Sequence, residues 1–287
     1  MKLAEGSVAI VTGGGSGLGR ETCVRLAEEG ARAIIVADRQ PGPKDGETTV
    51  DLIRAKGVEA IFVETDVTRA ADVDRAIGAA QAFGGVTTLI TFAGILQNGE
   101  LLDISEDEFD AILSVNIKGS FLIAQAASRA MINRGNQGAI VLVSSIGGLR
   151  GSGVSVAYSA SKGAVMLMGY AMADALAPHG IRVNVLHPGF IRTPMTKDID
   201  LADMPWKIAL DRARSRSIAR ANHPKSPMPP CSWPVRLPAS LPRLRCLPMA
   251  AWLTFSDGSD PPERRFGRTN TSAIGALLIQ VLVPDNT

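Results

Sequence analysis

The sequence contains few of the residues on which disulfide frameworks and metal centres are built. It has three cysteines and three histidines among 287 residues. The cysteines, Cys23, Cys231 and Cys246, form neither an even set nor a metal-like pair, and the histidines show no metal-ligand spacing. We therefore expect no structural or catalytic metal, and we expect the reducing cytoplasm as the compartment.

The chain also lacks an excess of charge of one sign and a long apolar run. Thirty basic residues face 28 acidic ones, which gives a formal net charge of +2. Such a balance creates no strong field, so neither nucleic acid nor an anionic membrane is expected as a partner. The start of the chain has no apolar core of a signal peptide, and the apolar stretch 273–283 is shorter than the roughly 20 residues that span a bilayer.

What the sequence does contain is a series of short apolar runs that alternate with longer segments of helical period. The runs are rich in Val and Ile and are apolar throughout, as in strands buried on both faces of a parallel sheet. They occupy residues 8–11, 33–37, 60–63, 88–90, 139–143 and 182–186. Between the first two, residues 19–29 form an expected helix with Cys23, Leu26 and Ala27 on one side. The pattern predicts an α/β fold, a doubly wound parallel sheet of the Rossmann type.

The texture of the sequence changes at Pro224. Residues 224–248 contain eight prolines, no acidic residue and no helical or strand period. Proline removes a backbone donor and disrupts helices and central strands alike. We therefore predict a single domain over residues 1–224 and an atypical tail without regular structure over residues 225–287.

A glycine-rich turn, residues 12–19, follows the first predicted strand and opens the first helix. Glycines allow a tight turn and a close approach to a pyrophosphate, and the start of the helix offers free N–H groups. Asp38 lies 19 residues after Gly19, at the end of the second strand. A carboxylate there can bind ribose hydroxyls and repel a 2′-phosphate, which favours NAD over NADP. Arg39 softens that preference or is a solvated surface charge.

Two further strand ends carry candidate cofactor contacts. Asp66 and Val67 follow the third strand, where the carboxylate either caps an adenine amino group or forms an ordinary turn. Ala93 and Gly94 follow the fourth strand, and there a small residue lets the backbone pass close to a cofactor.

Four polar residues are candidates for the chemistry. Tyr158 and Lys162 are four residues apart in a predicted helix and share a face. An ammonium beside a phenol, whose ordinary pKa is about 10, favours the phenolate. Ser145 ends a strand, where its hydroxyl can donate to a carbonyl oxygen. Asn116 lies inside an apolar helix, and a helix-interior asparagine satisfied by backbone or water is the simpler reading.

Taken together, these motifs resemble the short-chain dehydrogenase/reductases from about residue 5 to about residue 224. The resemblance rests on their joint order and spacing: 12–19, Asp66, Asn116, Ser145, 158–162, Pro188 and Gly189. It implies hydride transfer between NAD(H) and a secondary alcohol or ketone. A small-molecule substrate and, as is usual in this family, a homo-oligomer are implied as partners.

The resemblance also implies roles for individual residues. Tyr158 would be the general acid/base, and Lys162 would lower its pKa and bind the nicotinamide ribose. Ser145 would orient the substrate oxygen, and Asn116 would hold a water that relays protons to Lys162. Cofactor contacts are implied for Gly13, Ser16, Gly17, Leu18, Gly19, Asp38, Asp66, Val67, Ala93, Gly94, Tyr158, Lys162, Pro188, Gly189 and Thr193. Residues 194–220 would form a lid over the substrate, with Met195, Met204, Trp206 and Ile208 as its apolar members.

The sequence departs from the family in two places. Where the family carries Asn-Asn-Ala-Gly, this chain has Thr91-Phe92-Ala93-Gly94, which puts some hydrogen bonding at the strand end in doubt. The family's last helix and strand are absent after residue 224. In a shifted frame, the codons for residues 225–234 can encode Val-Ala-Asp-Ala-Ala-Leu-Phe-Leu-Ala, which matches that helix. We hypothesise a frameshift near Pro224, which also puts the family's oligomer surface in doubt.

These observations leave two functions open. An NAD-dependent alcohol dehydrogenase or ketone reductase is the leading one. The alternative is a catalytically inactive NAD-binding protein, either a regulatory sensor or an enzyme damaged by the frameshift.

Overall fold

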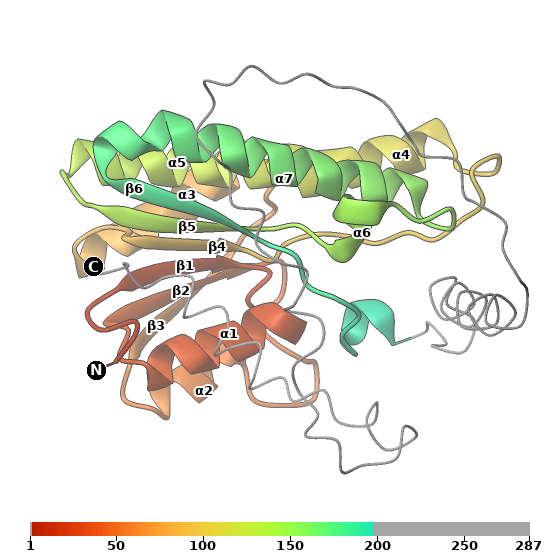
Figure 1. The fold of residues 1–287 in the computed structure, drawn as a ribbon. Helices are drawn as coiled ribbons and strands as arrows, with labels where there is room; N and C mark the ends of the chain where they lie inside the picture. The colour runs from red at the N-terminus through yellow and green to blue at the C-terminus, as the bar shows by residue number, and fades with distance from the viewer. Residues whose placement is uncertain (1, 198–287) are drawn as a thin grey trace, which may run out of the picture. The chain divides into compact units, whose positions relative to one another are not determined.

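A computed structural model of the chain describes residues 2–197, and the predicted parallel sheet lies within them. Six strands pair in the order β3-β2-β1-β4-β5-β6, and every pair is parallel (Figure 1). The strands are β1 (Val8–Thr12), β2 (Ala33–Asp38), β3 (Glu59–Glu64), β4 (Thr88–Thr91), β5 (Gly138–Val143) and β6 (Ile181–Leu186). The strand order reverses between β1 and β4, and ligands bind open α/β sheets beyond the carboxyl ends of strands at such a reversal.

Seven α-helices connect the strands in the described part of the chain. They are α1 (Gly17–Glu28), α2 (Thr49–Arg54), α3 (Ala70–Ala79), α4 (Glu106–Leu113), α5 (Ser120–Asn133), α6 (Ile146–Arg150) and α7 (Val156–Leu176). Short 3-10 turns are η1 (Ala80–Phe83), η3 (Ala177–His179) and η4 (Pro194–Thr196), and η2 (Ser114–Gly119) is a π-helical turn. Helices α1 and α2 lie on one face of the sheet, while α3, α5 and α7 cover the other (Figure 1). The doubly wound α/β fold predicted from the sequence is confirmed.

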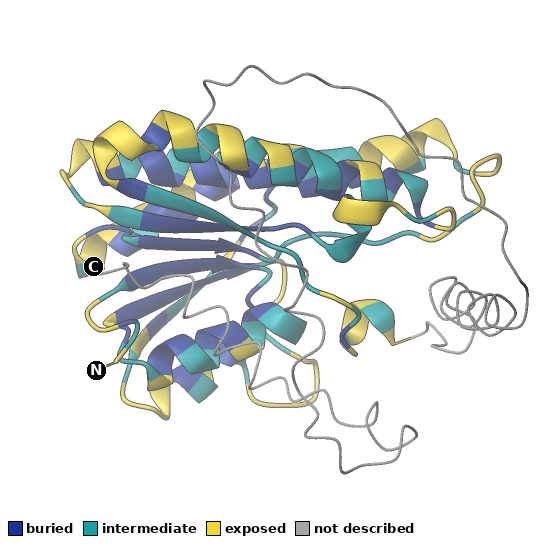
Figure 2. Ribbon diagram, viewed as in Figure 1, coloured by how far each residue is buried: buried dark blue, intermediate teal, exposed yellow. Residues whose placement is uncertain are grey.

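Two apolar clusters, one on each face of the sheet, hold these layers together. Cys23 and Leu26 of α1 pack with Ile34 of β2 in one cluster. Ile123 of α5 and Val165 of α7 belong to the cluster on the opposite face. Figure 2 shows the central strands as buried, in agreement with the predicted burial on both faces. The outer strands β3 and β6 are mostly half-buried, because they are the first and last strands in the sheet order.

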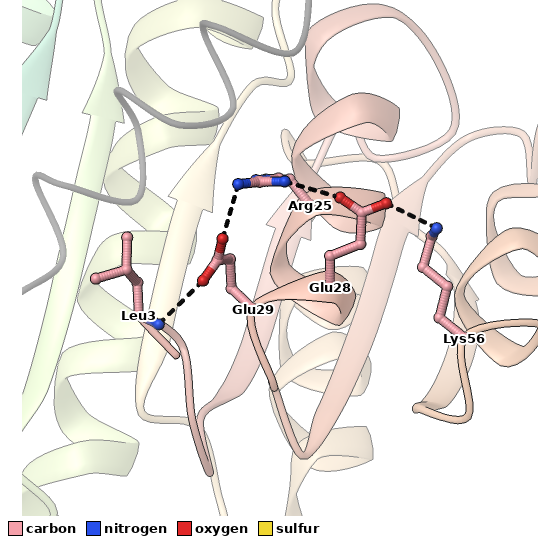
Figure 3. A network of polar contacts seen from close by, with 5 residues as sticks. All are labelled: Leu3, Arg25, Glu28, Glu29 and Lys56. Carbon is pink, nitrogen blue, oxygen red and sulfur yellow. Dashed lines mark hydrogen bonds and ion pairs between the residues drawn. The ribbon is translucent and has the colours of Figure 1, made fainter. Parts of the chain in front are cut away.

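Ion pairs fasten the carboxyl end of α1 to its neighbours (Figure 3). Arg25 lies 3.1 Å from Glu28 and 2.8 Å from Glu29. Glu28 also pairs with Lys56 at 2.8 Å, and Glu29 accepts a hydrogen bond from the backbone N–H of Leu3. Exposed pairs contribute only about 0–1 kcal/mol each. Their structural effect is to tie α1 to the start of the chain and to the end of α2.

The helical stretch Glu106–Asn133 is the one described segment that is long and apolar enough to cross a membrane. Its central part packs on the sheet through Ile123, Ala124 and Ala127, none of which is exposed. Core helices of globular proteins meet the same length and composition test, so we assign this stretch to the core.

Residues 198–287 lie outside the described part of the chain. Most of the predicted lid (194–220), the boundary at Pro224 and the tail (225–287) fall there. Those assignments therefore stay predictions.

Candidate active site

The glycine-rich turn between β1 and α1 lies against the end of β4. Gly13 has a φ of +68°, and a Cβ at this position would lie 2.7 Å from the backbone N of Ala93. Only glycine permits both the left-handed backbone and this approach. Ser16 precedes α1, and its side chain makes no capping hydrogen bond. The turn therefore presents backbone and helix N–H groups beside Ala93, an arrangement that fits a pyrophosphate.

The carboxylate of Asp38 is fixed at the same turn. Its Oδ2 accepts a hydrogen bond of 2.9 Å from the N–H of Gly15, and its Oδ1 accepts one of 2.6 Å from the N–H of Arg39. A Cβ on Gly15 would lie 2.1 Å from the carbonyl oxygen of Gln40 and 3.1 Å from Asp38 Oδ2. Asp38 therefore places a negative charge where the cofactor's ribose would meet the end of β2.

Asp66 follows β3 and forms a local turn. Its Oδ1 accepts hydrogen bonds from the N–H of Thr68 at 2.9 Å and from its hydroxyl at 2.7 Å. These hydrogen bonds, the hydroxyl's first, hold the pKa of Asp66 below its ordinary value. Val67 is buried against Gly119, at the end of η2. The turn that the sequence left open as an alternative is present, and the second carboxylate oxygen makes no hydrogen bond within residues 2–197 that would compete with an adenine.

Thr91 and Phe92 replace the family's two asparagines in different ways. The hydroxyl of Thr91 accepts a hydrogen bond of 3.2 Å from the N–H of Val143, which links the ends of β4 and β5. Phe92 packs against the apolar cluster on the α1 side of the sheet, and its N–H donates to the carbonyl of Thr12 at 2.9 Å. A link between β4 and β5 is therefore kept by Thr91, while Phe92 contributes packing.

Tyr158 and Ser145 meet beyond the carboxyl end of β5. Ser145 caps α6, and its Oγ accepts a hydrogen bond of 3.1 Å from the N–H of Gly147. Burial raises the pKa of the Tyr158 phenol, and its side-chain hydrogen bond with Ser145 lowers that pKa in part. A hydroxyl that accepts from a backbone N–H keeps its own proton to donate, so Ser145 can donate to a substrate oxygen beside Tyr158.

Lys162 lies beneath Tyr158 and is 5% exposed. Its Nζ is 5.7 Å from the centre of the Tyr158 ring and donates a hydrogen bond of 2.8 Å to the carbonyl of Val143. Burial lowers the pKa of Lys162 to about 8. A Cβ on Gly94 would lie 3.6 Å from Nζ and 3.1 Å from Oδ1 of Asn116. The segment that follows β4 thus passes next to Lys162 and Asn116.

Asn116 is completely buried and is satisfied by protein groups. Its Oδ1 accepts a hydrogen bond of 2.9 Å from the N–H of Ile95, and its Nδ2 donates to the carbonyl of Ile95 at 3.0 Å. The same Nδ2 donates to Oγ of Ser161 at 3.0 Å, and that hydroxyl donates to the carbonyl of Tyr158. The simpler reading, an asparagine satisfied by backbone, is therefore present; holding a relay water stays a prediction.

The segment after β6 runs from the chemical residues toward the glycine turn. The N–H of Ile146 donates to the carbonyl of Pro188 at 3.1 Å, and Nδ1 of His187 lies 3.4 Å from the carbonyl oxygen of Ser145. Burial lowers the pKa of His187, which favours the neutral ring. Farther along, the Cβ of Thr193 lies 3.5 Å from where a Cβ on Gly17 would stand. Residues 187–193 therefore border both halves of the site.

The sequence-based candidates thus gather along the carboxyl edge of the sheet, while three contributors were missed. Ser161 links Asn116 to Tyr158, the carbonyl of Val143 holds Lys162, and Gly147 holds Ser145. Ser161 could have been identified from the sequence, because it lies between Tyr158 and Lys162. A backbone carbonyl or N–H carries no such signal.

Comparison with known proteins identifies the family. A profile of the family described as short chain dehydrogenase matches residues 7–203. The chain is 39% identical over 195 residues to a 2,5-dichloro-2,5-cyclohexadiene-1,4-diol dehydrogenase of Sphingobium indicum, covering 68% of this chain and 76% of that protein. It is 40% identical over 194 residues to the L-2,3-butanediol dehydrogenase of Corynebacterium glutamicum, with coverages of 67% and 75%.

A solved structure agrees as well. The crystal structure of a short-chain type dehydrogenase/reductase from Mycobacterium marinum superposes with a TM-score of 0.65 at 35% identity, covering 70% of this chain and 78% of that one. The profile spans more than half of the chain, and the dehydrogenases above share over a third of their aligned residues with it. The chain therefore belongs to the short-chain dehydrogenase family and is an oxidoreductase.

Proposed function

We propose that this oxidoreductase transfers a hydride between NAD(H) and a secondary alcohol or ketone, with Tyr158 as the general acid/base. The observation that carries the proposal is the meeting of Tyr158 with Ser145 and Lys162, with Lys162 in turn lying beside Gly94 at the carboxyl edge of the sheet. Related dehydrogenases named for diols, including butanediol, support an alcohol substrate.

The residues fit a dinucleotide at two places. The backbone N–H groups of the turn around Gly13 and the start of α1 would hold the pyrophosphate. The carboxylate of Asp38, fixed by the N–H of Gly15, would bind the adenosine ribose and disfavour a 2′-phosphate, so we propose NAD. Hydride chemistry is what the bound nicotinamide supplies.

The chain's own groups would move the proton. In alcohol oxidation, the Tyr158 phenolate takes the proton of the substrate hydroxyl, while Ser145 donates a hydrogen bond to the same oxygen. Lys162, with a pKa of about 8, is charged near pH 7, and an ammonium in this position would favour the phenolate. Asn116 and Ser161 position this machinery, because their hydrogen bonds connect Ile95, the π-helical turn and the Tyr158 carbonyl.

The test is turnover of purified protein on a panel of secondary alcohols, with NAD⁺ and NADP⁺ in parallel and reduced cofactor followed by absorbance. We expect NADH from at least one alcohol and a larger kcat/KM with NAD⁺ than with NADP⁺. Calorimetry of NAD⁺ binding accompanies the panel. Tight NAD⁺ binding without NADH formation from any alcohol would instead favour the inactive NAD-binding protein.

A further inference from the structure

Two adjacent glycines of α6 have opposite surroundings. A Cβ on Gly148 would lie 2.6 Å from the carbonyl carbon of Lys162 and 2.8 Å from Oγ of Ser144, so that position has no room for a side chain. A Cβ on Gly147 would meet its neighbours at ordinary contact distances of 3.5 Å or more. Close packing against α7 therefore requires glycine at position 148 but not at position 147.

The space left open at Gly147 lies at the reacting groups. The atoms nearest to a Cβ there are Oγ of Ser145 at 3.5 Å, Cε1 of Tyr158 at 3.6 Å and Oγ of Ser159 at 3.7 Å. A substrate whose oxygen lies between Ser145 and Tyr158 must direct one substituent of its reacting carbon past this position. Because Gly147 has no side chain, the volume that a Cβ would fill beside Ser145 and Tyr158 stays free for that substituent.

Exposed apolar side chains lie on α6, just before α7 and in the loop between β4 and α4. Leu149 of α6 is 53% exposed, and Val154, just before α7, is 41% exposed. The carbonyl of Val154 accepts a hydrogen bond of 3.0 Å from the N–H of Gly99, so the loop between β4 and α4 lies beside it. In that loop Leu101 and Leu102 are 63% and 93% exposed.

The charges of these segments disfavour an anionic substrate. Within residues 95–105 and 146–155 the charged side chains are Glu100, Asp103 and Arg150, all exposed. Their balance is one negative charge, so these two segments offer a phosphorylated or carboxylated substrate a single cation, Arg150, and no cationic cluster.

From this geometry we infer that Gly147 determines specificity, and that the substrate is a neutral, apolar secondary alcohol whose reacting carbon carries a ring or a branched group. The inference rests on the proposed function, because it concerns the shape of the same site. On this inference, the size of the residue at position 147 limits the width of the substituent that the enzyme accepts.

The test compares Gly147→Ala and Gly147→Val with Gly153→Ala. A Cβ on Gly153 has nothing within 4 Å, so this variant is a matched control from the same region. The probes are 1-phenylethanol, with a wide substituent, and 2-butanol, with a narrow one, both oxidised with NAD⁺. The quantity measured is the ratio of kcat/KM for 1-phenylethanol to that for 2-butanol, and thermal unfolding verifies that each variant folds.

We expect wild-type enzyme to prefer 1-phenylethanol. The ratio should fall about 10-fold in Gly147→Ala and further in Gly147→Val, since one methylene of misfit costs about 10-fold to 200-fold. It should stay within about 2-fold in Gly153→Ala, as for a substitution into open space. A ratio that is unchanged at position 147, or changed equally by the control, overturns the inference and leaves the proposed function intact. If wild-type enzyme forms NADH from other alcohols of the panel but not from 1-phenylethanol, the inference is overturned and the proposed function stands; if it forms NADH from no alcohol of the panel, the proposed function falls and the inference with it.

Discussion

At the scale of single residues, burial of the Lys162 ammonium lowers the stability of the native state. The ammonium is buried under Tyr158 and donates a hydrogen bond to the carbonyl of Val143. Burial lowers the pKa of Lys162 from 10.5 to about 8. Lowering a lysine pKa on folding means that the native state holds the proton less tightly than the unfolded chain. Stability therefore increases as pH rises between the two pKa values.

We predict a pH-dependent difference between wild-type protein and Lys162→Met. Below pH 8 the lysine is charged in both states and the full burial cost is present; above pH 10.5 it is neutral in both. Relative to the variant, the free energy of unfolding of wild type should rise by about 3 kcal/mol across this window. Urea denaturation at several pH values measures it, with Lys118→Met, at an exposed lysine, as control. Parallel pH curves for wild type and Lys162→Met would contradict the prediction.

The residue scale also shows where sequence reasoning stops. The spacing of Tyr158 and Lys162 predicted a shared helix face, and both lie at the site. The expected lowering of the tyrosine pKa by lysine is not found: burial raises the pKa of Tyr158, and the opposing effect comes from the hydrogen bond with Ser145. The reason is geometric: Nζ points to the carbonyl of Val143, 5.7 Å from the ring centre. Four-residue spacing fixes the face of a helix but not the direction of a long side chain.

At the scale of elements, the π-helical turn η2 is the irregular feature that builds the site. Asn116 lies in this turn, and its amide takes both backbone groups of Ile95 as partners. Turns of this kind occur mostly inside α-helices and often at functional sites. Here the turn joins α4 to α5, and through Asn116 it links Ile95, which follows β4, to Ser161 of α7.

We predict that Asn116→Ala destabilises the protein more than Ser120→Ala. Removing the amide leaves the N–H and carbonyl of the half-buried Ile95 without their partners, at up to about 1–3 kcal/mol each. Ser120 is a matched control, since it is buried next to the same turn and makes one hydrogen bond, to the carbonyl of Asn116. Its loss should cost about 1 kcal/mol. If urea denaturation shows the same loss in the free energy of unfolding for both variants, the hydrogen bonds to Ile95 do not account for the effect of Asn116→Ala.

Most elements were predictable from apolar pattern, and the irregular ones were not. The six predicted strands lie within two residues of the observed ones, because uninterrupted Val and Ile runs demand burial on both faces. The five-residue helix α6 was not foreseen, since it is too short to show a period. The π-helical turn was not foreseen either, because Asn116 marks it only through contacts with a residue 21 positions away.

At the scale of the whole molecule, the described residues contain every candidate catalytic and cofactor-binding residue. The frameshift hypothesis concerns the chain beyond residue 224, outside the described part. It predicts that resequencing the gene reveals a shifted frame near Pro224 and, once corrected, the helix and strand expected of the family. An intact frame, with the same tail in close relatives, would contradict it.

The central claim is that Tyr158 moves the proton, and the two tyrosines of the chain allow a direct test. Tyr170 lies on the same helix α7 but is 57% exposed, so Tyr170→Phe is the matched control for Tyr158→Phe. The measurement is kcat for alcohol oxidation with NAD⁺, together with the Kd for NAD⁺. We predict that Tyr158→Phe lowers kcat by about 10²-fold to 10⁴-fold while NAD⁺ still binds, and that Tyr170→Phe leaves kcat unchanged. Full turnover by Tyr158→Phe would contradict the account.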